Sequence, residues 1–271
     1  MRAALTEDLG SGDATALLLD DVPAEARVIC KETAIIAGRP WFEACFRALD
    51  RDSRIDWQVD EGARVEVGTV ICSVHGRNRA IVSAERCALN FLQTLSATAT
   101  TTASYVEALA GSRTRVLDTR KTLPGLRQAQ KYAVRVGGGD NHRIGLYDAV
   151  MLKENHIAAA GSITAAVERA RALHPLLPVI VEVESLLELD EALATDCTRI
   201  LVDDFDAVML HEAVRRAAGR IPLEVSGGVS LERLAAIAAT GVDYVSVGAL
   251  TKHVRAIDFS LRLLAPASTR Q

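Results

Sequence analysis

The alternation of apolar and polar positions along the chain changes near residue 110. Before that point, residues 26–38 and 55–76 alternate apolar and polar side chains between glycine turns, which predicts antiparallel strands. Residues 39–50, between them, have helical spacing. Residues 83–111 predict one long helix, because leucines recur at helical spacing and Ser83 stands where an N-cap is expected. We expect this helix to bridge two regions of the chain.

After residue 110, short apolar strands alternate with helical stretches. Six such strands are predicted, at residues 115–118, 149–153, 178–184, 199–204, 222–228 and 243–249. The helix after the third strand starts with the capping-box spacing of Ser185 and Glu188, and a later helix ends at Gly241. Regular strand spacing from the third strand onward is typical of parallel βα units, so the fold class is α/β. Six strands are fewer than a full barrel has, so either the barrel is incomplete or the pattern hides a strand.

Charged and small residues follow the predicted barrel strands in a regular order. In α/β barrels the functional groups stand at the carboxyl ends of the strands, where the connecting loops meet. Here the first two strand ends carry cations, the next two carry acids and the last two are rich in glycine. The residues concerned are Arg120, Lys121, Lys153, Glu182, Asp203, Ser226, Gly227, Gly228 and Gly248. We expect them to line one site at the mouth of the barrel.

Each of these residue types suits one part of a small polyanion. Arginine binds carboxylates through two parallel hydrogen bonds, and lysine binds phosphate as a point charge. Glycine loops let backbone N–H groups approach a phosphate without a Cβ in the way. Glu182 and Asp203 could hold ribose hydroxyls or Mg²⁺ carried by a diphosphate, or they could pair with the neighbouring cations. The pattern therefore predicts a polyanionic ligand.

Further cations lie in the helical stretch 125–136 and in the loop that follows it. Arg127, Lys131 and Arg135 have a spacing that suits a solvated helix face, so we assign them no role in the site. Arg143 comes after a run of three glycines, and we group it with the strand-end cations.

No Ser-His-Asp, Cys-His or HExxH arrangement is recognisable, which disfavours covalent catalysis.

Composition limits the remaining possibilities. The 271 residues suffice for one large or two modest domains, and a formal net charge of -4 argues against a nucleic-acid or anionic-membrane surface. Neither a membrane span nor a signal peptide is recognisable. The five scattered cysteines never have CxxC spacing, which predicts free thiols in a reducing cytoplasm. His142 and His156 lack zinc-site spacing, so we expect no protein-held transition metal.

Several stretches of the sequence resemble motifs of the quinolinate phosphoribosyltransferase family. The longest stretch is residues 118–157, which begins with DTRKTLPGL and contains VGGGDNHR. Residues 4–15 and 83–96 are similar to the N-terminal motif and the interdomain helix of the family. Shorter motifs follow in family order at residues 181–184, 201–205, 224–228 and 246–253. The resemblance covers almost the whole chain.

The resemblance implies two domains and a reaction. Residues 1–110 would form an N-terminal α/β sandwich domain with the interdomain helix, residues 111–251 an open α/β barrel of parallel strands, and residues 252–271 would pack back on the first domain. The reaction would transfer phosphoribosyl from phosphoribosyl diphosphate to quinolinate with decarboxylation, giving nicotinate mononucleotide, diphosphate and CO₂ in de novo NAD synthesis. A homodimer or a multiple of it, a Mg²⁺ cofactor and a cytoplasmic location are implied as well.

The resemblance also implies a role for each matching position. Lys121, Glu182 and Asp203 would be catalytic, and the two acids would contact ribose and Mg²⁺. Arg86, which the pattern places against the dipole in the first turn of the long helix, would enter the site of the partner subunit. The full substrate-binding set is Arg86, Thr119, Arg120, Lys121, His142, Arg143, Lys153, Glu182, Asp203, Ser226, Gly227, Gly228 and Gly248. The last four would take the 5′-phosphate.

Three alternatives remain open. A phosphoribosyltransferase that takes nicotinate, or a paralogue associated with molybdenum transport genes, would share the fold, although a monoacid needs fewer cations. A carrier module is the second, because residues 60–71 have the glycine turns of biotinyl and lipoyl domains, but no lysine stands at the hairpin tip. A catalytically inactive scaffold is the third, and the intact set of charged residues argues against it. One departure from the family is Asp204, where asparagine is usual.

Overall fold

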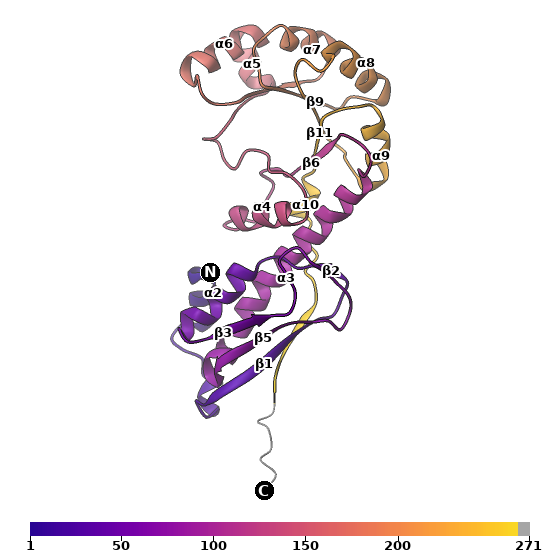
Figure 1. Ribbon diagram of the computed structural model, residues 1–271. Coiled ribbons are helices and arrows are strands. Elements are labelled where there is room, and N and C mark those ends of the chain that lie inside the picture. Colours follow the sequence, from indigo (N-terminus) through magenta and orange to yellow (C-terminus); the bar gives the residue numbers. More distant parts are fainter. Residues whose placement is uncertain (265–271) are drawn as a thin grey trace. The chain divides into compact units, whose positions relative to one another are not determined.

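The computed structural model describes residues 1–264, which divide into two compact units (Figure 1). The first unit comprises Met1–Thr101 together with the chain from Val254 onward, and the second comprises Thr102–His253. All the predicted site residues except Arg86 belong to the second unit. No helix in the described part of the chain combines the length and the apolarity that a membrane span requires.

The first unit is built on an antiparallel sheet with the strand order β12-β1-β5-β3. Its elements are α1 (Arg2–Leu9), a 3₁₀ turn (Ala16–Leu18), β1 (Pro23–Cys30), β2 (Ala34–Ile35), α2 (Arg39–Leu49), β3 (Arg54–Trp57), β4 (Arg64–Val65), β5 (Val70–Arg77), the first part of α3 (Asn78–Ala108) and β12 (Phe259–Leu263). Ala26, Val28 and Cys30 of β1 are fully buried and alternate with more exposed residues, as the two-residue period predicts. Phe42 and Phe46 of α2 complete the core of this unit.

The C-terminal part of the chain contributes the edge strand of this sheet. Residues 265–271 of the expected C-terminal segment lie outside the described residues. In the part that is described, β12 pairs antiparallel with β1, from Ala26 opposite Leu263 to Cys30 opposite Phe259.

The long helix α3 starts earlier than the sequence pattern predicts. It begins at Asn78, so Ser83 is not its N-cap and that prediction is wrong. Strand β5 ends at Arg77 and runs directly into the helix, so no turn residue marks the start in the sequence. The Ser83 hydroxyl instead donates a hydrogen bond to Oδ2 of Asp13 (2.7 Å) and ties the N-terminal segment to the helix. The last turns of α3 belong to the second unit, where Tyr105 is part of the core.

The second unit confirms the predicted open α/β barrel of six parallel strands. The strand order is β6-β11-β10-β9-β8-β7, so β6 and β7 are the edges of a sheet that does not close within the described residues. The strands are β6 (Arg115–Leu117), β7 (Val150–Leu152), β8 (Val179–Val183), β9 (Arg199–Asp203), β10 (Leu223–Ser226) and β11 (Tyr244–Ser246). The helices are α4 (Arg127–Val136), α5 (Glu154–Ala160), α6 (Ile163–Leu173), α7 (Leu186–Leu193), α8 (Ala207–Ala217), α9 (Leu231–Ala239) and α10 (Ala249–Lys252). Helices α5 to α9 lie along the outer face of the curved sheet (Figure 1).

Residues of each barrel strand alternate between two buried layers. On β9, Ile200 and Val202 belong to the large core between the sheet and the helices, whereas Leu201 packs with Ile180 in a small cluster inside the barrel. Successive side chains of a strand point to opposite faces. The next inward position on β9 is Asp203, at the end of the strand. Its carboxylate therefore lies at the mouth of the barrel.

Helix ends in the second unit follow the predicted chemistry closely. Ser185 is the N-cap of α7, and its Oγ accepts a hydrogen bond from the backbone N–H of Glu188 (3.2 Å). The Glu188 carboxylate accepts from the N–H of Glu184 (2.7 Å) instead of from Ser185, so the reciprocal bond of the box is shifted by one residue. Helix α9 is followed by Gly241 in the left-handed region, with φ +88°.

Candidate active site

The carboxyl ends of the barrel strands bring several of the predicted site residues together. Lys153, directly after β7, forms an ion pair with Glu182 of β8. Asp203 at the end of β9 lies opposite Ser226 of β10. A Cβ on Gly227 would lie 2.9 Å from Oδ1 of Asp203, so the glycine loop passes directly beside this carboxylate. The middle strand ends therefore form one acidic corner next to the glycine loop.

The ends of β6 and β11 form a second corner, where Thr119 and Lys121 meet Gly248. A Cβ on Gly248 would lie 3.0 Å from Cδ of Lys121 and 3.6 Å from Oγ1 of Thr119. The φ of Gly248 is −67°, which any residue can adopt, so the space and not the backbone conformation favours glycine here. The Thr119 hydroxyl also accepts a hydrogen bond from the N–H of Lys121 (3.1 Å).

Within the second unit, three cations of the predicted site hold no ion pair among residues 1–264: Arg120, Lys121 and Arg143. By contrast, Lys153 is paired with Glu182, and Arg115, at the opposite end of β6 from the site, is paired with Asp140 at 2.7 Å. Arg120 and Arg143 are half-buried, whereas Lys121 is exposed. Cations without a carboxylate partner suit an external anion, because such an anion would supply the missing hydrogen bonds and charge.

Arg143 is the clearest of these three cations. Its guanidinium lies 3.5 Å from the carbonyl oxygen of Ala149 and 3.5 Å from Sδ of Met151, which are weak contacts. Asp148, whose negative charge acts on Arg143, already accepts hydrogen bonds from two backbone N–H groups. Burial, followed by the positive charge of Arg120, lowers the pKa of Arg143. Arginine stays protonated all the same, so this guanidinium is a partly desolvated charge that can bind an anion.

The structure corrects the expectation that Lys131 lies on a solvated helix face. Lys131 is 1% exposed, and its Nζ forms an ion pair with Asp118, which is 0% exposed. Burial lowers the pKa of Lys131 and raises that of Asp118, against the attraction between the two charges. Arg127, Lys131 and Arg135 are spaced four residues apart and lie along one side of α4, but burial along that side is uneven. Arg135 is exposed, whereas Arg127 is half-buried and donates to backbone carbonyls.

His142 is buried and faces a carboxylate that the sequence analysis did not assign. Its Nδ1 accepts the backbone N–H of Arg143 (2.7 Å), and its Nε2 lies 3.3 Å from Oε2 of Glu224 on β10. Glu224 is 0% exposed and accepts a hydrogen bond from Arg199 at 2.9 Å. The Arg199 guanidinium in turn lies over the Tyr244 ring, 4.4 Å from its centroid. A cluster of charged and polar side chains thus fills the interior of the barrel below the strand ends.

A cavity of about 470 Å³ adjoins the glycine loop after β10. Asp203, Ser226, Gly227 and Gly228 line it, so it gathers the predicted acid of β9 and most of the predicted phosphate loop. Arg233 of α9 lines it too, and its guanidinium donates to the carbonyl oxygen of Gly228 at 3.0 Å. The cavity is therefore one of the places in the second unit where a phosphate and sugar hydroxyls could bind side by side.

The second acid of the VDDF motif, Asp204, has a special backbone conformation. Its φ is +57°, one of the two positive values among non-glycine residues that the structure describes. Asparagine and aspartate tolerate this left-handed region better than other non-glycine residues do. This conformation suits a short polar side chain at position 204.

Arg86 lies in the first unit and is exposed. It does not lie in the first turn of α3, as predicted, because α3 starts eight residues earlier, at Asn78. At 3.6 residues per turn, Arg86 lies beyond the first two turns, where the dipole has little effect. Its predicted role in the partner subunit stays a prediction.

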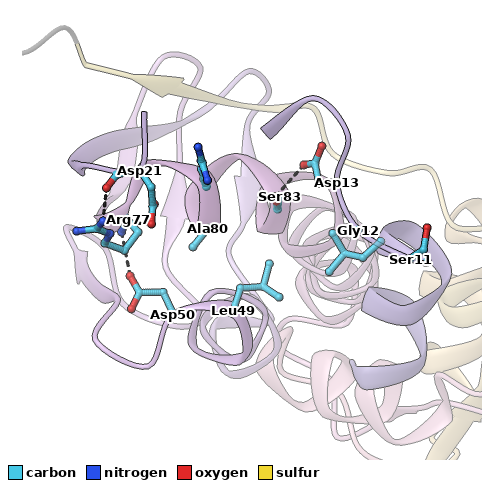
Figure 2. Close-up of a pocket in the computed structure, with 12 residues that line it drawn as sticks. Ser11, Gly12, Asp13, Asp21, Leu49, Asp50, Arg77, Ala80 and Ser83 are labelled. Atoms are coloured by element: carbon cyan, nitrogen blue, oxygen red, sulfur yellow. Dashed lines mark hydrogen bonds and ion pairs between the residues drawn. The ribbon is translucent and has the colours of Figure 1, made fainter. Parts of the chain in front are cut away.

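The first unit contains a cavity of about 500 Å³, shown in Figure 2. Arg77 lies between Asp21 and Asp50 there. Its guanidinium donates to Oδ2 of Asp21 (3.1 Å), and its backbone N–H donates to Oδ2 of Asp50 (2.9 Å). Asp13 is hydrogen-bonded to Ser83. Arg77, Asp21, Asp50 and Asp13 thus all have partners within the protein, and these contacts connect the N-terminal segment to the helix.

Metal binding by protein groups alone finds no support in the described part of the chain. No group of three or more histidine, cysteine, aspartate or glutamate side chains there is arranged to hold a metal ion. Glu182 and Asp203 are oxygen donors of the kind that Mg²⁺ prefers, but Glu182 is already paired with Lys153. This donor set suits an ion that arrives with most of its ligands supplied by a phosphorylated substrate.

Sequence reasoning missed Lys131, Glu224 and Arg233. The signal for Glu224 was present, because it is an acid between two apolar residues on a buried strand, like Glu182. No sequence signal separates Lys131 from an ordinary exposed lysine of an amphipathic helix. Arg233 follows the glycine loop by five residues, which places it in the first turn of the next helix.

Comparisons with known proteins agree over nearly the whole chain. Residues 13–96 match the family model described as "Quinolinate phosphoribosyl transferase, N-terminal domain", and residues 98–262 match the corresponding C-terminal domain. The chain is 44% identical to "Nicotinate-nucleotide pyrophosphorylase [carboxylating]" of Mycobacterium leprae, over 97% of this chain and 95% of that protein. It is 40% identical to "Probable nicotinate-nucleotide pyrophosphorylase [carboxylating]" of Bacillus subtilis, over 94% of this chain and 89% of that protein. The solved structure of the nicotinate-nucleotide pyrophosphorylase from Francisella tularensis superposes with a TM-score of 0.94 at 44% identity, covering 97% of this chain and 94% of that one.

Proposed function

The chain belongs to the quinolinate phosphoribosyltransferase family, and from this premise we propose how its residues carry out the reaction of that family. The protein is a pentosyltransferase of NAD biosynthesis that converts quinolinate to nicotinate mononucleotide with loss of CO₂. The phosphoribosyl donor in this proposal is phosphoribosyl diphosphate. The observation that supports it most strongly is the set of cations without ion pairs at the strand ends, because both substrates are polyanions.

We assign the acid subsite to Arg120, Arg143 and the neighbouring segment that carries His142. Quinolinate has two carboxylates, and paired guanidinium groups are the natural partners for them. Lys121 and Lys153 would stabilise the diphosphate as it leaves. Glycine N–H groups at 226–228 and at Gly248 would bind the 5′-phosphate.

Catalysis in this scheme depends on charge and position. The pyridine nitrogen attacks the anomeric carbon while the diphosphate leaves, and positive charge develops on the sugar. The carboxylates of Glu182 and Asp203 stabilise that charge, and the cations stabilise the leaving group. The ribosylated ring nitrogen is cationic, so it stabilises the electron pair left on the adjacent ring carbon when the carboxylate departs as CO₂. A proton from water then forms the C–H bond at that carbon. Mg²⁺, held by Glu182, Asp203 and the diphosphate, would neutralise part of the charge of the diphosphate.

We further propose a cytoplasmic homodimer in which Arg86 enters the site of the partner subunit. The five free and buried cysteines suit a reducing compartment. No nucleic acid or membrane partner is expected, given the acidic net charge.

Turnover of matched substrates tests the proposed function. With phosphoribosyl diphosphate and Mg²⁺, purified protein should form nicotinate mononucleotide from quinolinate and release one CO₂ per product, and nicotinate should be a far poorer substrate. Omission of Mg²⁺ should abolish turnover. Equal use of nicotinate, or no use of quinolinate, would contradict the assignment.

A further inference from the structure

The backbone of His142 is held on both sides by one buried ion pair. Its N–H donates to Oδ1 of Asp118 (2.8 Å), and its carbonyl oxygen accepts from Nζ of Lys131 (3.0 Å). The two charged groups also contact each other directly. The side chain of Asn141 strengthens the arrangement, donating to Oδ2 of Asp118 (2.7 Å) and to the carbonyl oxygen of Lys131 (2.9 Å).

Stability alone is a weak reason for such a pair. Removing two charges from water costs more free energy than most buried pairs recover, and apolar residues of similar volume often serve the fold as well. Asp118 and Lys131 are 0% and 1% exposed, so this cost applies in full. What the pair supplies beyond stability is a fixed position for a short segment of backbone.

The segment that is fixed carries Arg143, one of the two arginines of the proposed acid subsite. Arg143 follows His142 directly, and the contacts of its guanidinium with the protein are both 3.5 Å long. Its backbone N–H is bonded to the imidazole of His142. The direction of the Arg143 side chain therefore depends on where the backbone at residue 142 is held.

We propose that Lys131 and Asp118 are positioning residues of the acid subsite, which act through the backbone of His142 to aim Arg143 at a substrate carboxylate. This inference rests on the proposed function. Neither residue needs to touch the substrate. Lys131 belongs to helix α4 and not to the end of a barrel strand.

Two variants separate positioning from stability. Lys131→Met removes the donor to the His142 carbonyl and leaves the buried Asp118 without its cation, so the unfolding temperature should fall. The double variant Lys131→Met with Asp118→Asn carries no charge at either position. Its unfolding temperature should therefore return toward that of the wild type. In both variants the KM for quinolinate should rise by at least about tenfold, because neither restores the bond to the His142 carbonyl. The KM for phosphoribosyl diphosphate should change much less.

Asp243→Asn is the matched control. The Asp243 carboxylate also combines an ion pair, with Arg113 (2.6 Å), and a hydrogen bond from a backbone N–H, that of Leu223 (2.9 Å). It lies just before β11, at the opposite ends of the strands from the site. The Arg113 and Asp243 side chains are 61% and 30% exposed, so the control should lower the unfolding temperature only slightly and leave the KM for quinolinate unchanged.

The outcomes are distinct. Recovery of the KM for quinolinate together with stability in the double variant, or an equal rise of that KM in Asp243→Asn, would overturn the positioning role. Unaltered kinetics of folded Lys131→Met would overturn it too. Failure of the wild-type protein to turn over quinolinate would instead remove the proposed function on which the inference rests.

Discussion

Single atoms decide the shape of the corner where the first and last barrel strands end. Gly248 leaves room for the Lys121 side chain, and the space would be filled by one methyl group. Gly227 is less informative, because its φ of +81° would strain any substituted residue in addition to crowding Asp203. A substitution at position 248 therefore changes the site without straining the backbone.

Gly248→Ala should change substrate affinity with little change in stability. The φ of −67° accepts alanine, but the new Cβ would lie 3.0 Å from Cδ of Lys121 and push that side chain by a few tenths of an ångström. We expect the KM for phosphoribosyl diphosphate to rise by about three- to tenfold, measured with saturating quinolinate. The unfolding temperature serves as the control and should stay within about 2 °C of the wild type.

At the scale of elements, strand β10 links the interior of the barrel to the glycine loop. Glu224 lies on this strand beneath Ser226, and its carboxylate is bonded to Arg199 of the neighbouring strand. Burial by itself raises the pKa of Glu224, but the neighbouring His142 and Arg199 outweigh it, so the pKa lies below its ordinary value. A carboxyl group of this kind stabilises the fold in its ionised form.

Glu224→Gln should alter the pH dependence of stability. A pKa lowered by folding contributes stability that is present above the unfolded pKa, near 4.5, and is lost as the pH falls through the folded value. The wild type should therefore be more stable than the variant at pH 7, and the difference should shrink as the pH falls below about 4.5. Urea unfolding at a series of pH values measures it. A difference that stays constant or grows in acid would show that the Glu224 charge is not stabilising.

Some elements could be predicted from sequence and others could not, for identifiable reasons. The six barrel strands were predictable because each is a short apolar run between turn residues, and the cap at Ser185 was predictable because its chemistry is local. The start of α3 was not, because β5 continues into the helix without a turn signal. The burial of Lys131 was not either, because its partner Asp118 comes from another element and only tertiary packing brings the two together.

At the scale of the whole molecule, we propose that a second copy of the chain completes the site. Arg86 is exposed on the first unit, whereas the other predicted site residues belong to the second. The family resemblance predicts that this arginine enters the site of the partner subunit.

Complementation between two inactive variants tests the shared site. Arg86→Ala and Lys121→Ala should each be inactive, and a mixed dimer would contain one site with both defects and one with neither. If the subunits exchange freely in an equal mixture, activity should return to about a quarter of the wild-type value, because half of the dimers are mixed and each has one intact site. Demonstrated exchange without recovered activity would show that Arg86 does not act across the interface.

Direct binding of quinolinate tests most directly the claim that the unpaired strand-end cations form the acid subsite. Calorimetric titration should compare the wild type with Arg143→Met and with Arg135→Met, the latter removing an exposed arginine of α4. Loss of one charge-assisted hydrogen bond or more should weaken binding by at least about tenfold in Arg143→Met, and Arg135→Met should bind as the wild type does. Unchanged quinolinate affinity in folded Arg143→Met would contradict the account.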